Sequence, residues 1–261
     1  MLAFFFALSA AASPLRAPQS SDDTVLLGKA AFEATLPLSS AAAEALVARD
    51  HGAASAALDQ VDAAMLTKQQ QNDLGFLKAW VSIRDNRADD ALAHLADVEA
   101  SRTAPESYRW LTMGEIHLAN RDLHNAADAF QQIPESEPIA ARAKLQLAAA
   151  HQQSGATREA LSLYADLANR DDPAESGEIA LWALAQKRGL SNPTARPWLL
   201  RLWMHYPLSS AAKSANAALM AHHTKPSADD YGTRAIRLME LGAWSAVNGT
   251  VAPRIQQFPL T

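Results

Sequence analysis

The sequence predicts an all-α protein that folds as a right-handed solenoid of helical hairpins. A period of about 34 residues is typical of a repeat made of two short helices. Alanines recur at spacings of 34, 35 and 34 residues in similar surroundings, at Ala57, Ala91, Ala126 and Ala160. Valine and isoleucine are sparse while alanine and leucine are abundant, which favours helices over strands. Solenoids usually hold other molecules, so the period also points away from a self-contained enzyme.

We expect three segments in this chain of 261 residues. Residues 1–23 are predicted to be a signal-peptide-like segment and a linker, residues 24–173 to hold the repeats, and residues 174–261 to continue the superhelix with further hairpins. Each hairpin of a solenoid packs only on its neighbours, so one elongated body needs no division into separate cores.

The N-terminus resembles the apolar and small-residue parts of a secretory signal peptide. An apolar run at residues 2–8 leads into small residues at 9–13, and residues 10–12 fit a cleavage site. The basic residues that normally precede the run are missing, and a helical cap on the first repeat is the alternative interpretation. The run is shorter than the ~18 apolar residues of a membrane span. We therefore expect an exported, periplasmic protein without a transmembrane span.

The clearest repeat unit covers residues 107–140, and the units around it follow the same helical spacing. In this unit the pattern consists of Trp110, Met113, Gly114 and His117 in the first helix, and of Ala126, Phe130 and Ile133 in the second. The other units match through Leu147, Ala148, Gly155, Ala160, Tyr164 and Leu167, through Ala45, Gly52, Ala57 and Val61, and through Ala79, Asn86, Ala91, Leu95 and Val98.

This pattern resembles the tetratricopeptide repeat over residues 39–172, and the resemblance implies the same paired-helix fold. We expect small residues on the first helices to allow a close approach of the helices. We also expect glycine or asparagine to adopt a positive φ at the hairpin turns. The small residues are Ala45, Ala79, Gly114 and Ala148, and the turn residues are Gly52, Asn86 and Gly155.

Helices continue after residue 173, although the strict period ends there. The predicted elements are a helix at 178–188 that stops at Gly189, a helix at 196–205 with Pro197 in its first turn, a helix through Ala215 and Leu219, a helix capped by Ser227, and a turn at 241–243 into a last helix with Trp244.

Two segments of this C-terminal region carry a narrower resemblance. Residues 198–212 are similar to the helix–Tyr-Pro-x-Ser–helix step of periplasmic repeat proteins. Residues 231–242 resemble an Arg-Ala-x-x-Leu-x-x-x-Gly helix that opens a further hairpin. In this order they resemble the non-catalytic superhelical region of soluble lytic murein transglycosylases, exported enzymes that cleave the glycan of peptidoglycan. The resemblance implies a role in peptidoglycan turnover; a generic periplasmic repeat protein remains the alternative.

We expect no catalytic residue, cofactor or metal in this chain. The transglycosylase acid is a glutamate followed by serine on a helix, but Glu106, Glu135 and Glu175, which precede serines, fall in turns. A general acid needs a pKa raised by burial, and glutamates at helix starts are explained by the helix dipole. His222 and His223 point apart on a helix and cannot share a metal, and no glycine-rich phosphate loop is present.

A protein or peptide, or peptidoglycan itself, is the expected partner. The net charge of −5 gives no basic footprint for nucleic acid. First helices line the concave face of such solenoids, so we expect partner contacts at Arg109, Glu115, Lys144 and Gln152. His117 and His151, at equivalent repeat positions, either replace a packing tyrosine or form a ligand-contacting ladder.

Three functions are compatible with the sequence. The first is an exported, non-catalytic scaffold or binding module of the bacterial cell envelope, linked to peptidoglycan turnover. The second is the N-terminal fragment of a soluble lytic murein transglycosylase without its lysozyme-like catalytic domain. The third is a cytosolic scaffold that uses the same fold to bind peptides.

Overall fold

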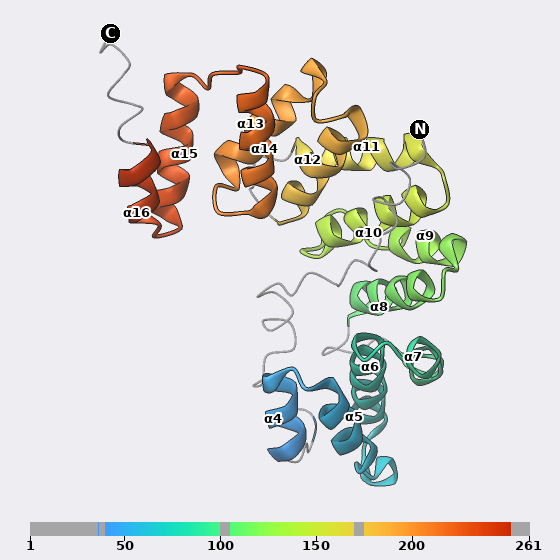
Figure 1. Cartoon of the computed structure of the whole chain (residues 1–261). Coiled ribbons are helices and arrows are strands. Elements are labelled where there is room, and N and C mark those ends of the chain that lie inside the picture. The colour runs from blue at the N-terminus through green and yellow to red at the C-terminus, as the bar shows by residue number, and fades with distance from the viewer. Residues whose placement is uncertain (1–35, 37–39, 100–104, 170–174, 252–261) are drawn as a thin grey trace, which may run out of the picture. The chain divides into compact units, whose positions relative to one another are not determined.

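The computed structural model describes residue 36 and residues 40–99, 105–169 and 175–251, and these are helical with no β-strand among them (Figure 1). The chain divides into two compact parts, residues 1–139 and 140–261. The predicted all-α class built from helical hairpins is thereby confirmed. The signal-like segment at residues 1–13 lies outside the described residues.

The described residues of the first part form three consecutive helix pairs. These are α4 (Ser40–Ala48) with α5 (His51–Asp59), α6 (Lys68–Arg84) with α7 (Ala88–Leu95), and α8 (Glu106–Ala119) with α9 (Leu123–Gln131). A 3-10 turn, η1 (Ala63–Met65), precedes α6. The first pair contacts the second through α5 and α6, and the second contacts the third through α7 and α8.

The second part begins with a similar pair and then changes its connections. Its elements are α10 (Ala140–Gln153), α11 (Thr157–Ala168), α12 (Glu175–Arg188), η2 (Pro193–Ala195), α13 (Arg196–His205), α14 (Ser210–Ala221), α15 (Ala228–Glu240), α16 (Trp244–Ala246) and the π-helical turn η3 (Val247–Val251). The sequence predicts these C-terminal helices closely. Ser227 caps α15 as expected, and Gly189 ends α12 with a φ of 85°.

One turn geometry joins the helices within the repeat pairs. A single residue with positive φ ends the first helix: Arg49, Asn86, Arg121 or Gly155. After Arg49, Asn86 and Arg121, the next N–H donates to a carbonyl five residues earlier, as Asp122 does to His117 at 2.8 Å. This is the Schellman arrangement, which satisfies carbonyls that the helix end leaves open. Asn86 and Gly155 confirm the sequence prediction.

The first repeat unit has a different register from the predicted one. Gly52 lies inside α5, and Arg49 takes the left-handed position instead. The alanine equivalent to Ala91 is then Ala54, which is fully buried, whereas Ala57 is only partly buried. The reason is a three-residue insertion, because α6 has 17 residues where α8 has 14. Ala54 and Ala57 share one helix face, so either alanine satisfies the pattern.

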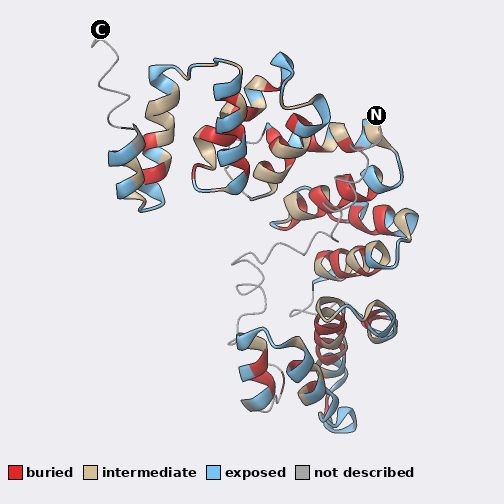
Figure 2. Ribbon diagram, viewed as in Figure 1, coloured by how far each residue is buried: buried red, intermediate tan, exposed pale blue. Residues whose placement is uncertain are grey.

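Each repeat pair is closed by a small residue on its first helix and a large one on its second. The pairs are Ala42 with Leu58, Ala79 with Leu95, Gly114 with Phe130, and Ala148 with Tyr164, all of them buried. Figure 2 shows the buried residues of these helices in red. Ala42 therefore replaces the predicted Ala45. A Cβ added at Gly114 would lie under 3.0 Å from three atoms of the Phe130 ring. The close helix approach predicted for Gly114 is thus present.

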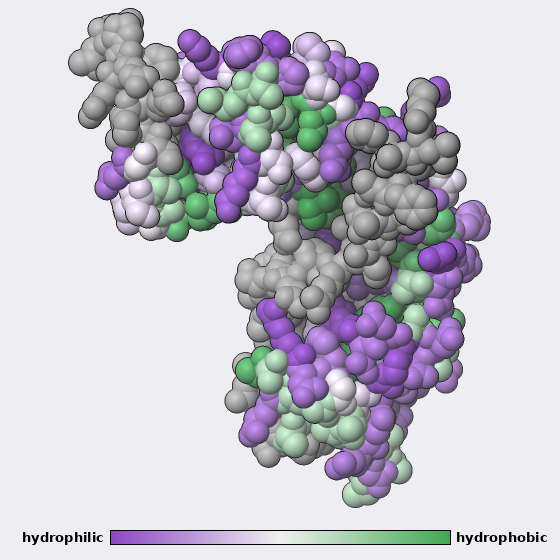
Figure 3. Space-filling model, in the orientation of Figure 1, coloured by the Kyte–Doolittle hydropathy of each residue, from purple (hydrophilic) through white to green (hydrophobic). Residues whose placement is uncertain are grey.

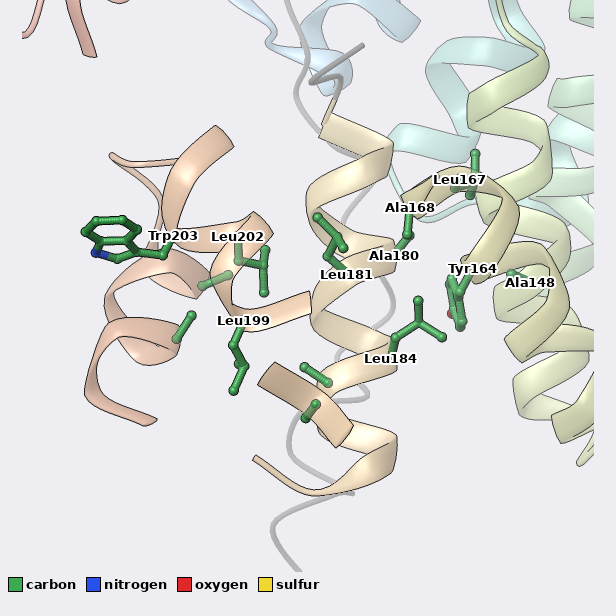
Figure 4. Packing of buried hydrophobic residues seen from close by; sticks show 14 of the residues in the cluster. Ala148, Tyr164, Leu167, Ala168, Ala180, Leu181, Leu184, Leu199, Leu202 and Trp203 are labelled. Atoms are coloured by element: carbon green, nitrogen blue, oxygen red, sulfur yellow. The ribbon is translucent and has the colours of Figure 1, made fainter. Parts of the chain in front are cut away.

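A continuous apolar core joins α10 to α14 in the second part. Tyr164 of α11 faces Leu184 of α12, and Leu199 and Leu202 of α13 continue the same cluster (Figure 4). Trp203 belongs to this core, with 5% of its surface exposed. Trp244, by contrast, is 61% exposed.

Candidate functional site

The four predicted partner-contacting residues all lie on the first helices of repeat pairs. Arg109 and Glu115 belong to α8 in the first part of the chain, and Lys144 and Gln152 belong to α10 in the second. Gln152 is exposed, whereas the other three are partly buried. The contacts that these side chains make within each part of the chain are described below for each residue.

Glu115 is paired with an arginine of the preceding hairpin. Its carboxylate lies 3.9 Å from the Arg84 guanidinium, and the two side chains are only 10% and 11% exposed. Arg84 in turn lies over the Trp80 ring, 3.9 Å from the ring centroid. Such a cation–π contact is favourable where water is largely excluded. Glu115 therefore takes part in contacts that connect α6 and α8 rather than presenting an open charge.

His51 completes this group of side chains, which we name the Trp80 cluster (His51, Trp80, Arg84 and Glu115). Its ring meets the Trp80 ring edge-on at 5.8 Å between centroids. Burial, followed by the nearby Arg84 guanidinium, lowers the pKa of His51 below its ordinary value of 6.5. The environment of His51 therefore favours its neutral form, next to one cation (Arg84) and one carboxylate (Glu115).

Arg109 has a different environment on the same helix. Its Nε is buried, and the described part of the chain offers it no hydrogen-bond partner. A buried guanidinium nitrogen without a partner is unfavourable, but this atom has almost no exposed surface, so a bound molecule would reach it only if the side chain moved. Of the four predicted residues, Arg109 has the clearest unused hydrogen-bonding capacity.

Lys144 and Gln152 both make contacts inside the α10–α11 pair. Lys144 Nζ lies 3.6 Å from a carboxylate oxygen of Asp166. The Tyr164 hydroxyl donates to Gln152 Oε1 at 3.0 Å, and burial raises the pKa of Tyr164. Because Asp166 is 62% exposed, this ion pair contributes little stability and a partner could displace it.

His117, the first of the two histidines at equivalent repeat positions, contacts the turn of its own hairpin. His117 Nδ1 lies 3.2 Å from a carboxylate oxygen of Asp122, the residue whose side chain caps α9. Hydrogen bonds from Asn125 and the proximity of His117 hold the pKa of Asp122 below its usual range. His117 therefore stabilises the turn of its own hairpin. His151, one repeat later on α10, is also partly buried.

The glutamates that precede serines lie at helix starts and turns. Glu106 is exposed in the first turn of α8, Glu135 is exposed in a turn, and Glu175 begins α12. His222 and His223 lie at the end of α14, and His223 has a φ of 52°. Within the described ranges, no group of three or more His, Cys, Asp or Glu side chains could hold a metal. No described helix is both long and apolar enough to cross a bilayer.

The two C-terminal segments that carry the narrower resemblance contact each other directly. The Arg234 guanidinium of α15 donates to the carbonyl of Trp203 and, at 3.3 Å, to that of Pro207. Arg237 donates to the carbonyl of His205, also at 3.3 Å. These bonds satisfy carbonyls at the C-terminal end of α13, where cations are favoured. Sequence alone could not reveal this pairing, because about 30 residues separate the partners.

The Trp203 ring strengthens the same junction. The Arg234 guanidinium lies 4.7 Å from its centroid, and Tyr231 meets the ring edge-on at 5.0 Å. The arginine and the tyrosine of residues 231–242 therefore have structural roles here.

Comparisons with family models, curated proteins and solved structures found no match.

Proposed function

We propose that this protein is an exported, non-catalytic binding scaffold of the bacterial cell envelope, with a role linked to peptidoglycan turnover. The observation that carries the proposal is the series of helix pairs with one repeated turn geometry. Arrays of this kind offer extended surfaces of side chains, and they rarely build an enclosed catalytic centre. The signal-like start and the two C-terminal segments support the envelope and peptidoglycan parts of the proposal.

The first helices supply the binding side chains in this proposal. Arg109 is partly buried on α8, and Lys144 of α10 pairs with Asp166, whose side chain is 62% exposed. Both are cations, so they suit a partner with carboxylates, such as an acidic peptide or the peptide stems of peptidoglycan.

Co-sedimentation of the purified chain with peptidoglycan sacculi, alongside capture from an envelope extract, tests this function. The variant with Arg109→Glu and Lys144→Glu should bind several-fold less, and circular dichroism should show unchanged helicity. The matched control reverses two exposed cations elsewhere, Arg158→Glu and Lys213→Glu, and changes the net charge equally. If both double variants bind like the wild type, the first helices are not the binding surface.

The contact between residues 198–212 and residues 231–242 favours a second candidate. In this candidate the chain is the superhelical part of a soluble lytic murein transglycosylase whose catalytic domain is encoded downstream. Reading the DNA past the last codon distinguishes the two: a continuing frame with a Glu-Ser lysozyme-like domain supports the enzyme fragment. Cell fractionation that finds the uncleaved chain in the cytosol would instead select a cytosolic peptide-binding scaffold.

A further inference from the structure

The second part of the chain contains a long segment without acidic residues. Residues 179–228 hold six lysines and arginines and no aspartate or glutamate, which gives this segment a formal charge of +6. The whole chain has a net charge of −5, so all other residues together carry −11. An acidic chain that concentrates positive charge in one segment has a local surface suited to a negatively charged partner.

The fold places four of these six cations at one end of the helices α12, α13 and α14. The connections between these helices, residues 189–195 and 206–209, are short, and consecutive helices pack on each other in alternating directions. The end of α12, the start of α13 and the end of α14 therefore lie at the same end, and Figure 1 shows the α14–α15 connection there, at the top of the view. We name these four cations the basic end: Lys187 and Arg188 in the last turn of α12, Arg196 at the start of α13, and Lys225 after α14.

The side chains of the basic end are accessible and lack ion pairs. Three of the four are exposed, and Arg196 is partly buried. Within the described ranges none of the four pairs with a carboxylate, whereas Lys144 and Arg237 in the same part of the chain do. Figure 3 shows hydrophilic side chains along the upper edge of this part. These cations can therefore contact an external anion without first breaking an internal ion pair.

Helix dipoles explain only part of this grouping. The dipole favours cations in the last turn of a helix, which accounts for Lys187 and Arg188 on α12. The same effect disfavours Arg196, because it occupies the first position of α13. Lys225 lies outside any helix, in the connection to α15. The four like charges repel one another, and a bound anion would reduce this repulsion.

Acidic residues border the basic end but do not pair with it in the described part of the chain. Glu159 follows Arg158 at the start of α11, and Asp229 and Asp230 lie in the first turn of α15. Asp230 accepts a hydrogen bond from the Ser227 N–H at 2.7 Å and caps its own helix. The positive charge of the basic end is therefore bounded by these acidic residues and not cancelled by them.

A negatively charged bilayer suits this arrangement better than a single anionic ligand does. The four cations come from three separate helix ends, and a discrete carboxylate or phosphate needs donors that converge on one point. A bilayer presents many negative headgroups, so each cation strengthens binding without a fixed spacing to the others. Met220, in the last turn of α14, is 61% exposed and adds an apolar side chain at the same end.

We propose that the basic end binds the anionic headgroups of a phospholipid bilayer. In this contact Lys187, Arg188 and Lys225 lie against the headgroups, and Met220 reaches the boundary of the acyl chains. The contact is peripheral and electrostatic, so it weakens as salt screens the charges. It does not depend on a role in peptidoglycan turnover.

Co-sedimentation of the full chain with vesicles tests the proposal. Vesicles of phosphatidylcholine that contain phosphatidylglycerol should bind the chain at low salt, whereas vesicles of phosphatidylcholine alone should not. One cation near an anionic bilayer strengthens binding roughly fivefold, so the variant with Lys187→Gln, Arg188→Gln and Lys225→Gln should bind at least tenfold more weakly. The matched control, with Lys68→Gln, Arg121→Gln and Lys213→Gln, also loses two exposed lysines and one exposed arginine, and it should bind like the wild type.

A fluorescent label gives a second measurement. The chain contains no cysteine, so Ser191→Cys and Ser210→Cys each introduce one thiol for an environment-sensitive dye. Both serines are exposed, but Ser191 lies in the connection at the basic end and Ser210 begins α14 at the opposite end. The dye at position 191 should shift its emission to shorter wavelength on anionic vesicles, and the dye at position 210 should not.

Three results would overturn the proposal. One is a wild-type chain that binds the two kinds of vesicle equally, or binds neither. Another is an equal loss of vesicle binding in the basic-end variant and the matched control. The third is a basic-end variant that keeps its vesicle binding but no longer binds peptidoglycan sacculi, because this would assign the four cations to the wall polymer.

Discussion

The hairpins before residue 170 and those after residue 174 are held together in different ways. In the earlier ones, one left-handed turn residue and one small-against-large pair recur in every unit, as in Gly114 with Phe130. In the later ones, left-handed residues also occur, at Gly189, His223 and Gly242, but α15 packs back on α13 through Arg234. The packing of the repeat pairs depends on side-chain volume, whereas the contact of α15 with α13 depends on hydrogen bonds from a guanidinium group.

This difference shows which kind of contact can recur in successive repeat units. A pair such as Ala148 and Tyr164 lies within one hairpin, so the same spacing reproduces it along the chain. The Arg234 contact needs a helix end with open carbonyls at a suitable place on another element. Arg237 makes a similar contact with the carbonyl of His205, and both contacts lie where the strict period has ended.

The largest effect is expected at Phe130. This side chain is 2% exposed and fills the space against Gly114, so Phe130→Ala leaves a cavity. We expect the free energy of unfolding to fall by ~3–5 kcal/mol, measured by urea denaturation. Leu92→Ala on the exposed side of α7 is the control and should cost much less. A loss below 1 kcal/mol at Phe130 would contradict the packing described here.

The second effect concerns the guanidinium contacts of the C-terminal region. Arg234→Met keeps the aliphatic stem but removes the donors to the carbonyls of Trp203 and Pro207. Hydrogen bonds from charged groups contribute roughly 1.5–3 kcal/mol, so we expect a loss of this order in the unfolding free energy. Arg158→Met, an exposed residue on α11, should have almost no effect. Equal losses of unfolding free energy in both variants would show that Arg234 contributes no more than an exposed arginine does.

The third prediction compares two helical glycines that receive the same substitution. Gly114→Ala brings a methyl group against the Phe130 ring, and such overpacking costs about 1–3 kcal/mol. Gly232→Ala meets no atom within 4 Å, and alanine should stabilise that helix by about 0.8–1 kcal/mol. Thermal unfolding should therefore show opposite shifts. Stabilisation by both alanines would mean that the two helices of the α8–α9 pair do not approach closely.

The smallest effect is a pH dependence that belongs to the Trp80 cluster. The folded pKa of His51 is lowered, mainly by burial, so the unfolded chain takes up its proton first as pH falls below 6.5. The contribution of His51 to the free energy of unfolding is fully present above pH 6.5, and it is lost as the pH falls towards the lower folded pKa. His94 and His205, whose pKa values burial also lowers, act in the same direction.

Unfolding free energies between pH 7.5 and 5 measure this contribution, within the range where histidine titrates. His51→Gln should make the decline less steep, whereas His124→Gln, at a side chain that is 87% exposed, should leave it unchanged. A steeper decline in the His51 variant would mean that folding raises the pKa of His51 instead of lowering it.

Local spacing made most of the fold predictable from the sequence. Ala91, Ala126 and Ala160 were placed correctly because each lies at a fixed distance from its own turn. The sequence pattern places the first unit three residues too late, because Ala54 and Ala57 lie on one face of α5. Arg49 could not be predicted as a left-handed residue, because the Schellman bonds around it fix a conformation that arginine does not itself favour.

The surroundings of the candidate site were less predictable. The sequence places Glu115 correctly on a first helix, but the ion pair that restricts it involves Arg84, a residue of another hairpin. The contact between Gln152 and Tyr164 likewise depends on how α10 and α11 face each other. Side-chain partners across helices follow from packing, and a linear pattern does not specify them.

The central claim is that a small residue on the first helix and a large one on the second touch and hold each repeat pair. A double-mutant cycle with Gly114→Ala and Phe130→Leu tests this claim most directly, because leucine leaves room for the added methyl group. We predict that the double variant is more stable than the sum of the single effects implies, with a coupling energy of about 1–2 kcal/mol, within the range seen for residues in contact. Strict additivity would show that the two positions do not touch, and would contradict the account.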